Sequence, residues 1–170
     1  LTTKQIVDFK KFYHTEDARF QLLPPGIYPD RKYSNQPPGS RERYREANGI
    51  TPQQFLLLQV GSDFSRKGVS RSIAAVAALP EAIRRQTQLF VVGQDKPRTF
   101  ASQAEKLGVK ENVHFFAGRD DVAHLMAAAD VLLHPAKQEA AGIVLVEAIA
   151  AGLPVLVTEV CGYAPHVAAA

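Results

Sequence analysis

Hydrophobic and polar positions change period repeatedly along the chain. Compact apolar runs, typical of strands buried on both faces, alternate with longer stretches in which apolar residues recur at helical spacing. This pattern, with its short connections, predicts an α/β fold built on a doubly wound parallel sheet. We expect strands at 20–23, 55–60, 89–93, 113–116, 131–134 and 155–158. We expect helices at 4–13, 41–48, 69–79, 98–107, 121–129 and 143–151.

The composition changes sharply within residues 24–40, which hold five prolines and two glycines. This is linker composition, so we place a domain boundary there. The last expected strand is followed only by CGYAPHVAAA, whereas a doubly wound sheet normally places a further helix after such a strand. The chain also lacks an initiator Met. We therefore expect a piece of a longer protein that is truncated at its C-terminus.

Charge and cysteine content narrow the class of protein only slightly. The net charge is +3, and the positive excess lies within the first 50 residues. A solvated linker face explains this excess better than an anionic partner, and we expect no nucleic-acid binding. The single cysteine, Cys161, excludes an intrachain disulfide and fits a reducing compartment. No apolar run is long enough to cross a membrane as a helix.

The stretch 134–154 holds the strongest candidate chemistry. Glu139 and Glu147 flank the start of a predicted helix, and small residues at 140–142 would let a ligand approach its backbone. The first amides of a helix attract phosphate, and a carboxylate can accept hydrogen bonds from ribose hydroxyls. Taken singly, each glutamate is better explained as an ordinary helix residue. The apolar neighbours of Glu147 nevertheless predict a dedicated partner for its charge.

Two other loops follow predicted strands and therefore lie at the same edge of the sheet. Arg66 and Lys67 lie in the loop GSDFSRKG, where two cations suit a diphosphate, although solvated loop charges are a common alternative. This loop has neither the P-loop nor the dinucleotide spacing. The loop at 117–119, with Gly118 and Arg119, could hold a base, but an ordinary turn is an equal alternative. His134 ends a buried strand beside the site and could contact a ligand there, but it is better explained as a satisfied buried histidine.

Metal chemistry has no support in the sequence. The histidines and Cys161 have no metal-ligand spacing, and there is no Asp-x-Asp motif. We therefore expect neither a metal nor another cofactor.

Several ordered motifs resemble a known family: GSDFSRKG after an apolar strand, then LFVVGQ, VHFFAGR and VLLHPAKQEAAGIVLVEAIAAGLPVL. They resemble the C-terminal, donor-binding half of retaining glycosyltransferases of family 4, which have the GT-B fold of two facing Rossmann-like domains. The resemblance covers roughly residues 20–165. It implies that residues 1–40 are the tail of an N-terminal domain and the interdomain linker. Residues 41–170 would then form the Rossmann-like domain that binds the nucleotide-sugar donor.

The resemblance also implies a role for each candidate residue. Glu139 would contact the donor sugar, Glu147 would hold the ribose hydroxyls, and Arg66 with Lys67 would bind the diphosphate. Glu139, Lys67 and Arg66 would form the catalytic set. Many members carry Arg after the first glycine of the phosphate loop, where this chain has Ser62, so Arg66 would substitute. The remaining donor contacts would come from Gly61, from Gly118 and Arg119 around the uracil, and from the amides of Ala141, Gly142, Ile143 and Val144.

The activity implied is transfer of a hexose, and the finer motifs imply glucose moved from UDP-glucose to a heptose of the lipopolysaccharide inner core. The lipid-linked acceptor would be bound by the N-terminal domain, so this chain alone would be inactive. The full-length protein would be cytoplasmic, with peripheral association at the inner membrane. The alternative is a non-catalytic nucleotide-sugar-binding module. An NAD-dependent oxidoreductase is disfavoured, because the glycine fingerprint and its following acid are absent.

Overall fold

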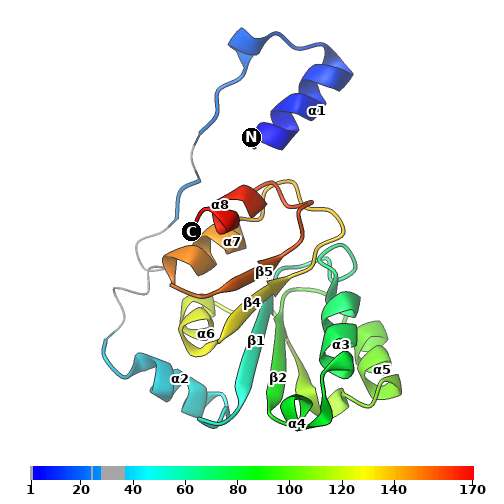
Figure 1. Cartoon of the computed structure of the whole chain (residues 1–170), viewed down its shortest axis with the longest axis vertical. Coiled ribbons are helices and arrows are strands. Elements are labelled where there is room, and N and C mark those ends of the chain that lie inside the picture. Colours follow the sequence, from blue (N-terminus) through cyan, green and yellow to red (C-terminus); the bar gives the residue numbers. More distant parts are fainter. Residues whose placement is uncertain (1, 24, 28–36) are drawn as a thin grey trace.

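A parallel sheet of five strands lies at the centre of the computed structural model, which describes residues 2–23, 25–27 and 37–170. The strands are β1 (Phe55–Val60), β2 (Thr87–Val92), β3 (Val113–Phe116), β4 (Val131–His134) and β5 (Val155–Val157). Their order is β3-β2-β1-β4-β5, with β1 in the middle (Figure 1). The chain thus winds outward from β1 in both directions, which confirms the predicted doubly wound α/β fold.

Helices cover both faces of the sheet. One face carries α3 (Val69–Ala78) and α5 (Arg98–Lys106), and the other carries α2 (Ser40–Ala47), α6 (Val122–Ala128), α7 (Ile143–Ala150) and α8 (Ala164–Ala168). The short α4 (Glu81–Arg84) precedes β2, and a 3-10 turn (Lys110–Asn112) precedes β3. The chain begins with α1 (Thr3–Tyr13) and a second 3-10 turn (Asp17–Arg19).

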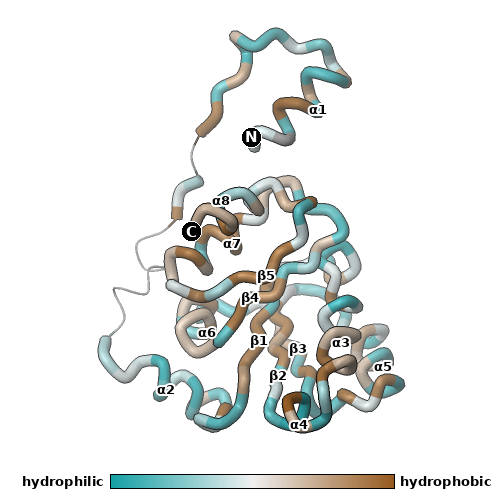
Figure 2. The backbone as a smooth tube through the Cα atoms, viewed as in Figure 1, coloured by the Kyte–Doolittle hydropathy of each residue, from teal (hydrophilic) through white to brown (hydrophobic). Residues whose placement is uncertain are grey.

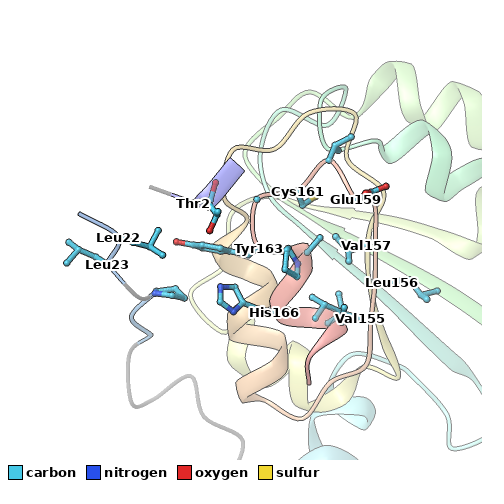
Figure 3. Close-up of a pocket in the computed structure, with 18 residues that line it drawn as sticks. Thr2, Leu22, Leu23, Val155, Leu156, Val157, Glu159, Cys161, Tyr163 and His166 are labelled. Atoms are coloured by element: carbon cyan, nitrogen blue, oxygen red, sulfur yellow. The ribbon is translucent and has the colours of Figure 1, made fainter. Parts of the chain in front are cut away.

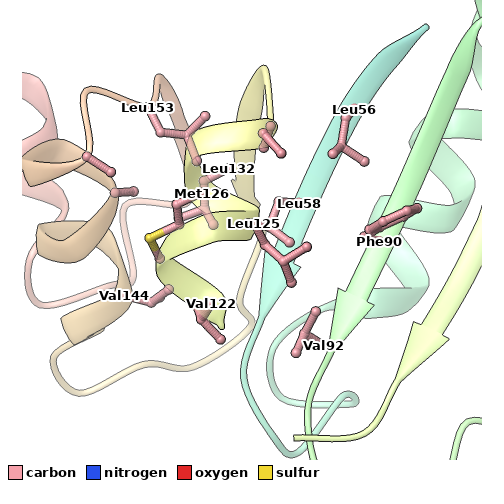
Figure 4. Packing of buried hydrophobic residues seen from close by; sticks show 14 of the residues in the cluster. Leu56, Leu58, Phe90, Val92, Val122, Leu125, Met126, Leu132, Val144 and Leu153 are labelled. Carbon is pink, nitrogen blue, oxygen red and sulfur yellow. The ribbon is translucent and has the colours of Figure 1, made fainter. Parts of the chain in front are cut away.

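The central strand β1 explains why the apolar runs in the sequence are continuous. Leu56 and Leu58 are fully buried and pack with Leu125 of α6 (Figure 4). Leu57, which points to the opposite face, joins a second cluster with Ile73 of α3. Because successive side chains of a strand point to opposite faces, a strand covered on both sides is apolar at most positions. The exception in β1 is Gln59, which is buried and donates to the Lys67 carbonyl at 2.8 Å.

The strand predicted at 20–23 is wrong. The segment pairs with no strand in the described part of the chain, and Leu22 and Leu23 are 55% and 65% exposed. A short apolar run forms a strand only where a neighbour accepts its backbone hydrogen bonds. The start of β2 was also predicted too late, because Thr87 pairs in register with Phe55. The sequence did not predict α4, and α8 is a short helix after the last strand, where a doubly wound sheet normally places one.

The predicted linker falls largely on residues 24 and 28–36, which lie outside the described residues. The boundary between residues 1–40 and 41–170 therefore stays a prediction. Helix α2, which follows this segment, is hydrophilic along most of its length (Figure 2). Helix α2 must therefore be held to the domain largely by polar contacts.

Three charged side chains supply those contacts, and we call Arg41, Arg45 and Asp130 the arginine clamp. Asp130 lies 2.5 Å from Arg41 Nη2 and 3.2 Å from Arg45 Nη1. Its Oδ2 also accepts a hydrogen bond of 2.7 Å from the Leu56 amide. Both arginines donate to carbonyls at the end of α6, namely those of Ala127, Ala128 and Ala129. The clamp therefore ties α2 to the last turn of α6 and the first residues of β1.

Candidate functional site

The carboxyl ends of the parallel strands bring the predicted loops to one edge of the sheet (Figure 1). The loop after β1 and the loop after β4 meet there because these strands are neighbours. As a result Lys67, from the first loop, forms an ion pair with Glu139, from the second. Two residues separated by 72 positions in the sequence are thus in direct contact, at the edge where doubly wound sheets bind ligands.

Backbone contacts fix how closely these two loops approach. Gly68 has a φ of +75°, and a Cβ placed there would lie only 2.0 Å from the carbonyl oxygen of Pro135. The Lys137 amide also donates to the Arg66 carbonyl at 2.8 Å. Arg71, one turn into α3, donates to the Pro135 carbonyl at 3.1 Å. Only glycine fits position 68, because a side chain would be both strained and in collision with the second loop.

Glu139 is held from two sides. Lys67 Nζ and His134 Nε2 both contact its Oε2, the histidine at 3.3 Å. The three side chains are largely removed from solvent, with 13% of Lys67, 9% of Glu139 and none of His134 exposed. The sequence placed Lys67 and Glu139 at one edge but did not favour a contact between His134 and Glu139. Its position five residues upstream, at the end of a buried strand, was the only indication.

The ionisation of this group follows from burial and charge together. Burial alone would raise the pKa of Glu139, but the hydrogen bond and positive charge of Lys67, helped by His134, hold it below its ordinary value. Burial lowers the pKa of His134, and the nearby Lys67 lowers it further, while Glu139 acts in the opposite direction. At neutral pH the site therefore contains a carboxylate, an ammonium group and a neutral imidazole.

Arg66 is not part of this contact group. Its Nε lies 3.0 Å from Oδ2 of Asp63, and 41% of its side chain is exposed. The backbone hydrogen bond from Arg66, followed by the one from its side chain, lowers the pKa of Asp63. The two adjacent cations that we predicted to act together therefore point to different partners. The role of Asp63 as the partner of Arg66 was not predicted from the sequence.

The loop after β3 holds Arg119 in a fixed position. Its guanidinium binds both carboxylate oxygens of Asp121, at 2.7 and 2.5 Å, and lies 5.3 Å from the ring centre of Phe116. Hydrogen bonding to Arg119 lowers the pKa of Asp121. Gly118 lies against the side chain of Gln94, where a Cβ would come within 2.9 Å of the amide nitrogen. This loop presents exposed backbone at 117–118 beside an immobilised guanidinium.

The start of α7 presents backbone amides at the same edge. Gly142 is the N-cap residue with a φ of +89°, and no side chain among the described residues caps the helix. The preceding loop is held by backbone hydrogen bonds from Gly162 to Glu139 (3.2 Å) and from Tyr163 to Ala141 (2.9 Å). The first N–H groups of a helix have no acceptor in a preceding turn, so this end carries a partial positive charge next to the Glu139 carboxylate.

Glu147 lies in the second turn of α7 and is half-buried. Ile143, four residues earlier and so on the same side of the helix, is 46% exposed. Val144, Leu145 and Ala148 form the buried side. The apolar sequence around Glu147 therefore belongs in part to the buried side of the helix. The structure places Gly61 at the end of β1, with a φ of +139° and close to the Lys67 side chain.

The described residues contain neither a candidate metal site nor a helix that could span a membrane. No group of three or more His, Cys, Asp or Glu side chains among them could hold a metal ion. No helix in the described part of the chain is long and apolar enough to cross a membrane. The expectation that the protein works without a metal or cofactor stays a prediction.

A mostly apolar hollow of about 1090 Å³ lies elsewhere, between the N-terminal segment and β5 with α8 (Figure 3). Leu22 and Leu23 line one side, and Val155, Tyr163 and His166 line the other. None of the predicted site residues lines it. The predicted site residues therefore lie outside this hollow, at the edge of the sheet that carries Lys67 and Glu139.

Comparison with known proteins shows the family to which the chain belongs. The family model described as glycosyl transferases group 1 matches residues 40–170. The chain is 73% identical over 168 residues to lipopolysaccharide glucosyltransferase WaaG of Escherichia coli (strain K12), a match that covers 99% of the chain and 45% of that protein. It therefore spans less than half the length of this relative.

Two solved structures show the same arrangement of elements. The crystal structure of WaaG superposes with a TM-score of 0.98 at 72% identity, covering 99% of this chain and 46% of that one. The structure of Anabaena Alr3699/HepE in complex with UDP-glucose superposes with a TM-score of 0.67 at 28% identity. That match covers 75% of this chain and 35% of the other.

Proposed function

Since the chain belongs to the family of glycosyl transferases group 1, we propose that it forms the donor-binding part of a retaining glucosyltransferase. The donor would be UDP-glucose and the acceptor a heptose of the lipopolysaccharide inner core. The observation that carries the proposal is the Lys67–Glu139 ion pair at the carboxyl edge of the sheet, beside the uncapped start of α7. The likeness to a lipopolysaccharide glucosyltransferase favours a transferase over a non-catalytic binding module.

The diphosphate of the donor would lie between Lys67 and the first amides of α7. Lys67 contributes a full charge, and the amides of Gly142, Ile143 and Val144 contribute aligned dipoles. Negative charge develops on the departing UDP during transfer, and fixed positive groups at that point stabilise it. No step in this scheme calls for a metal ion. Arg66 can join because its pair with Asp63 is exposed and therefore weak.

Binding of the donor would rearrange the ion pair. The diphosphate competes with Glu139 for the Lys67 ammonium, so the carboxylate becomes available for hydroxyl groups of the sugar. Glu147, half-buried in the second turn of α7, would accept hydrogen bonds from the ribose. Gly118 and Arg119 would frame the uracil. The acceptor, which is lipid-linked, would be bound by residues outside this chain, and the full-length protein would associate peripherally with a membrane.

Titration with UDP-glucose, followed by calorimetry or NMR shifts, tests this proposal. We expect wild-type binding, and we expect Lys67→Met to weaken it about tenfold or more, because a charge-assisted hydrogen bond is worth about 1.5–3 kcal/mol. Lys110→Met is the matched control, since Lys110 pairs with Glu105 on the exposed surface. Loss of affinity in both variants, or no binding of UDP-glucose and UDP by the wild type, would overturn the proposal.

Glu147→Gln tests the ribose contact separately. The substitution keeps the size of the side chain but replaces the carboxylate, which can accept hydrogen bonds from both ribose hydroxyls, with a neutral amide. We therefore expect the affinity for UDP to fall severalfold. Glu105→Gln serves as the control on an exposed helix surface.

A panel of UDP-, GDP- and ADP-sugars then identifies the base. Equal affinity for all three would contradict a uracil site at Gly118 and Arg119.

A further inference from the structure

His134 contacts the carboxylate that the proposed site uses for the donor sugar. It is the last residue of β4, and its side chain is 0% exposed. Its Nε2 lies 3.3 Å from Oε2 of Glu139. Its Nδ1 is also buried and has no hydrogen-bond partner among the described residues. Glu139 is thus the polar partner of the imidazole in the part of the chain that the structure describes.

The contact fixes where the proton of the imidazole lies. A carboxylate can only accept hydrogen bonds, so Nε2 must carry the hydrogen that it shares with Glu139. The charged groups that face His134 are Lys67, from the loop after β1, and Glu139 itself. On the neighbouring edge strand β5, the residue in register with His134 is the uncharged Val157. Burial and the nearby ammonium keep the imidazole neutral, which leaves Nδ1 without a proton.

The two donors leave one side of the carboxylate open. Lys67 and His134 both bind Oε2 of Glu139, and no described residue binds Oε1. Building on the donor site proposed above, we propose that His134 is a positioning residue for Glu139. Its Nε2–H holds Oε2 and thereby directs Oε1 toward a hydroxyl of the bound sugar.

The role becomes essential when the donor binds. A diphosphate draws Lys67 away from Glu139, and a carboxylate left with no partner would rotate or recruit water. His134 cannot follow the phosphate, because its ring is enclosed at the end of β4. It therefore keeps the carboxylate oriented during the exchange of its other partner. Loss of the His134 hydrogen bond should therefore weaken binding of the sugar, which Glu139 contacts, and leave the nucleotide contacts nearly unchanged.

The ratio of the UDP and UDP-glucose dissociation constants isolates this effect. His134→Phe keeps the ring volume and removes the donor, so we expect the extra affinity for UDP-glucose over UDP to fall about tenfold. His134→Gln, which retains a side-chain N–H, should restore most of it. His114→Phe is the matched control, since this histidine lies in the edge strand β3 and bonds Gln88 at 2.7 Å. An unchanged ratio in His134→Phe, or an equal loss for both ligands, would overturn the proposal.

The tautomer of His134 provides a second test of the proposal, which needs no ligand. Long-range proton–nitrogen NMR of the imidazole should show a proton on Nε2 and none on Nδ1 at neutral pH, and the Nε2 signal should shift in Glu139→Gln. A proton on Nδ1 would contradict the proposal even where His134→Phe does not fold. If the wild type binds neither UDP nor UDP-glucose, the donor site itself fails. The tautomer then still decides whether His134 orients Glu139.

Discussion

At the scale of single residues, Gly68 determines whether the two site loops can meet. Its positive φ and its contact with the Pro135 carbonyl are separate requirements, and each alone favours glycine. Lys67 directly precedes this position, so any displacement of residue 68 moves the ammonium away from Glu139. A position without a side chain therefore controls the geometry of a charged pair.

Gly68→Ala should therefore be more destabilising than an ordinary glycine substitution. The left-handed backbone costs about 1–2 kcal/mol for a residue with a Cβ. The collision with Pro135 adds at least about 1 kcal/mol of overpacking. Gly108→Ala is a matched control, because Gly108 has a φ of +69° and nothing within 4 Å of the added Cβ. Urea unfolding measures both variants, and equal losses would show that the Pro135 contact does not matter.

The pKa shifts of His134 and Glu139 predict how stability depends on pH. The pKa of His134 lies below its ordinary value of 6.5, so below that pH the unfolded chain takes up the proton more readily. Stability should therefore fall as the pH drops below about 6.5, and fall further below about 4.5 as Glu139, whose pKa is also lowered, resists protonation in the fold. His134→Gln should remove the upper part of this fall in urea unfolding series. A wild-type profile that is flat between pH 7 and 5 would contradict this expectation.

Single residues also show where sequence analysis stops. The pattern of strands was enough to place Lys67 and Glu139 at one edge, because each follows a buried parallel strand. It could not show that they pair with each other, since side-chain partners depend on the distance between loops. Arg66 illustrates the same limit, because its side chain hydrogen-bonds to Asp63, three residues earlier in the same loop. Within the described part of the chain, His134 has one nitrogen bonded and one without a partner, so the predicted satisfied histidine is only half correct.

At the scale of elements, the arginine clamp gives α2 a fixed place that its own apolar surface could not provide. Arg45 is largely buried and also donates to the carbonyls of Thr51 and Gln54. One side chain thus joins the end of α6, the turn before β1 and Asp130. The helix is positioned by hydrogen bonds to backbone, which a pattern of apolar residues does not reveal.

Arg45→Met should consequently destabilise the domain by about 3–5 kcal/mol, because it removes one partner of a largely buried ion pair and leaves carbonyls without donors. Arg43→Met is the control on the same helix, since Arg43 is exposed and bonds only Ser40 among the described residues at 3.0 Å. Thermal or urea unfolding compares the two. A loss below about 1 kcal/mol for Arg45→Met would mean that the clamp contributes little.

The elements that the sequence predicted correctly share a physical cause. Long helices and doubly buried strands carry a periodic apolar pattern that directly reflects their burial. The error at 20–23 and the unpredicted α4 lie where a segment is short and its packing partner decides its conformation. Leu22 and Leu23 have strand composition without a strand to pair with.

At the scale of the whole molecule, the sheet divides the protein into two ends with different tasks. The carboxyl ends carry Lys67, Glu139 and the start of α7, whereas the amino ends carry the clamp. The alternation of elements predicted the doubly wound class. The spatial order of the strands could not be derived, because it depends on which crossover passes to which side of β1.

This division predicts that the chain binds the donor but does not complete the transfer. All the donor contacts proposed above come from described residues, whereas no residue proposed here contacts an acceptor. We expect a measurable affinity for UDP-glucose together with no glucose transfer to a heptose acceptor beyond the enzyme-free background. A radiolabelled transfer assay, run beside the binding titration, checks both parts. Transfer that Lys67→Met abolishes would show that the chain carries the complete machinery.

The arginine clamp has a mechanical consequence as well. A pull on the chain through residue 40 reaches the domain through the guanidinium groups of Arg41 and Arg45, which pass the load to α6 and to the first residues of β1. This load enters at the amino ends of the strands, and the ligand edge lies at the opposite ends. Tension that enters through residue 40 therefore acts at the amino ends of the strands, opposite the loops that hold Glu139.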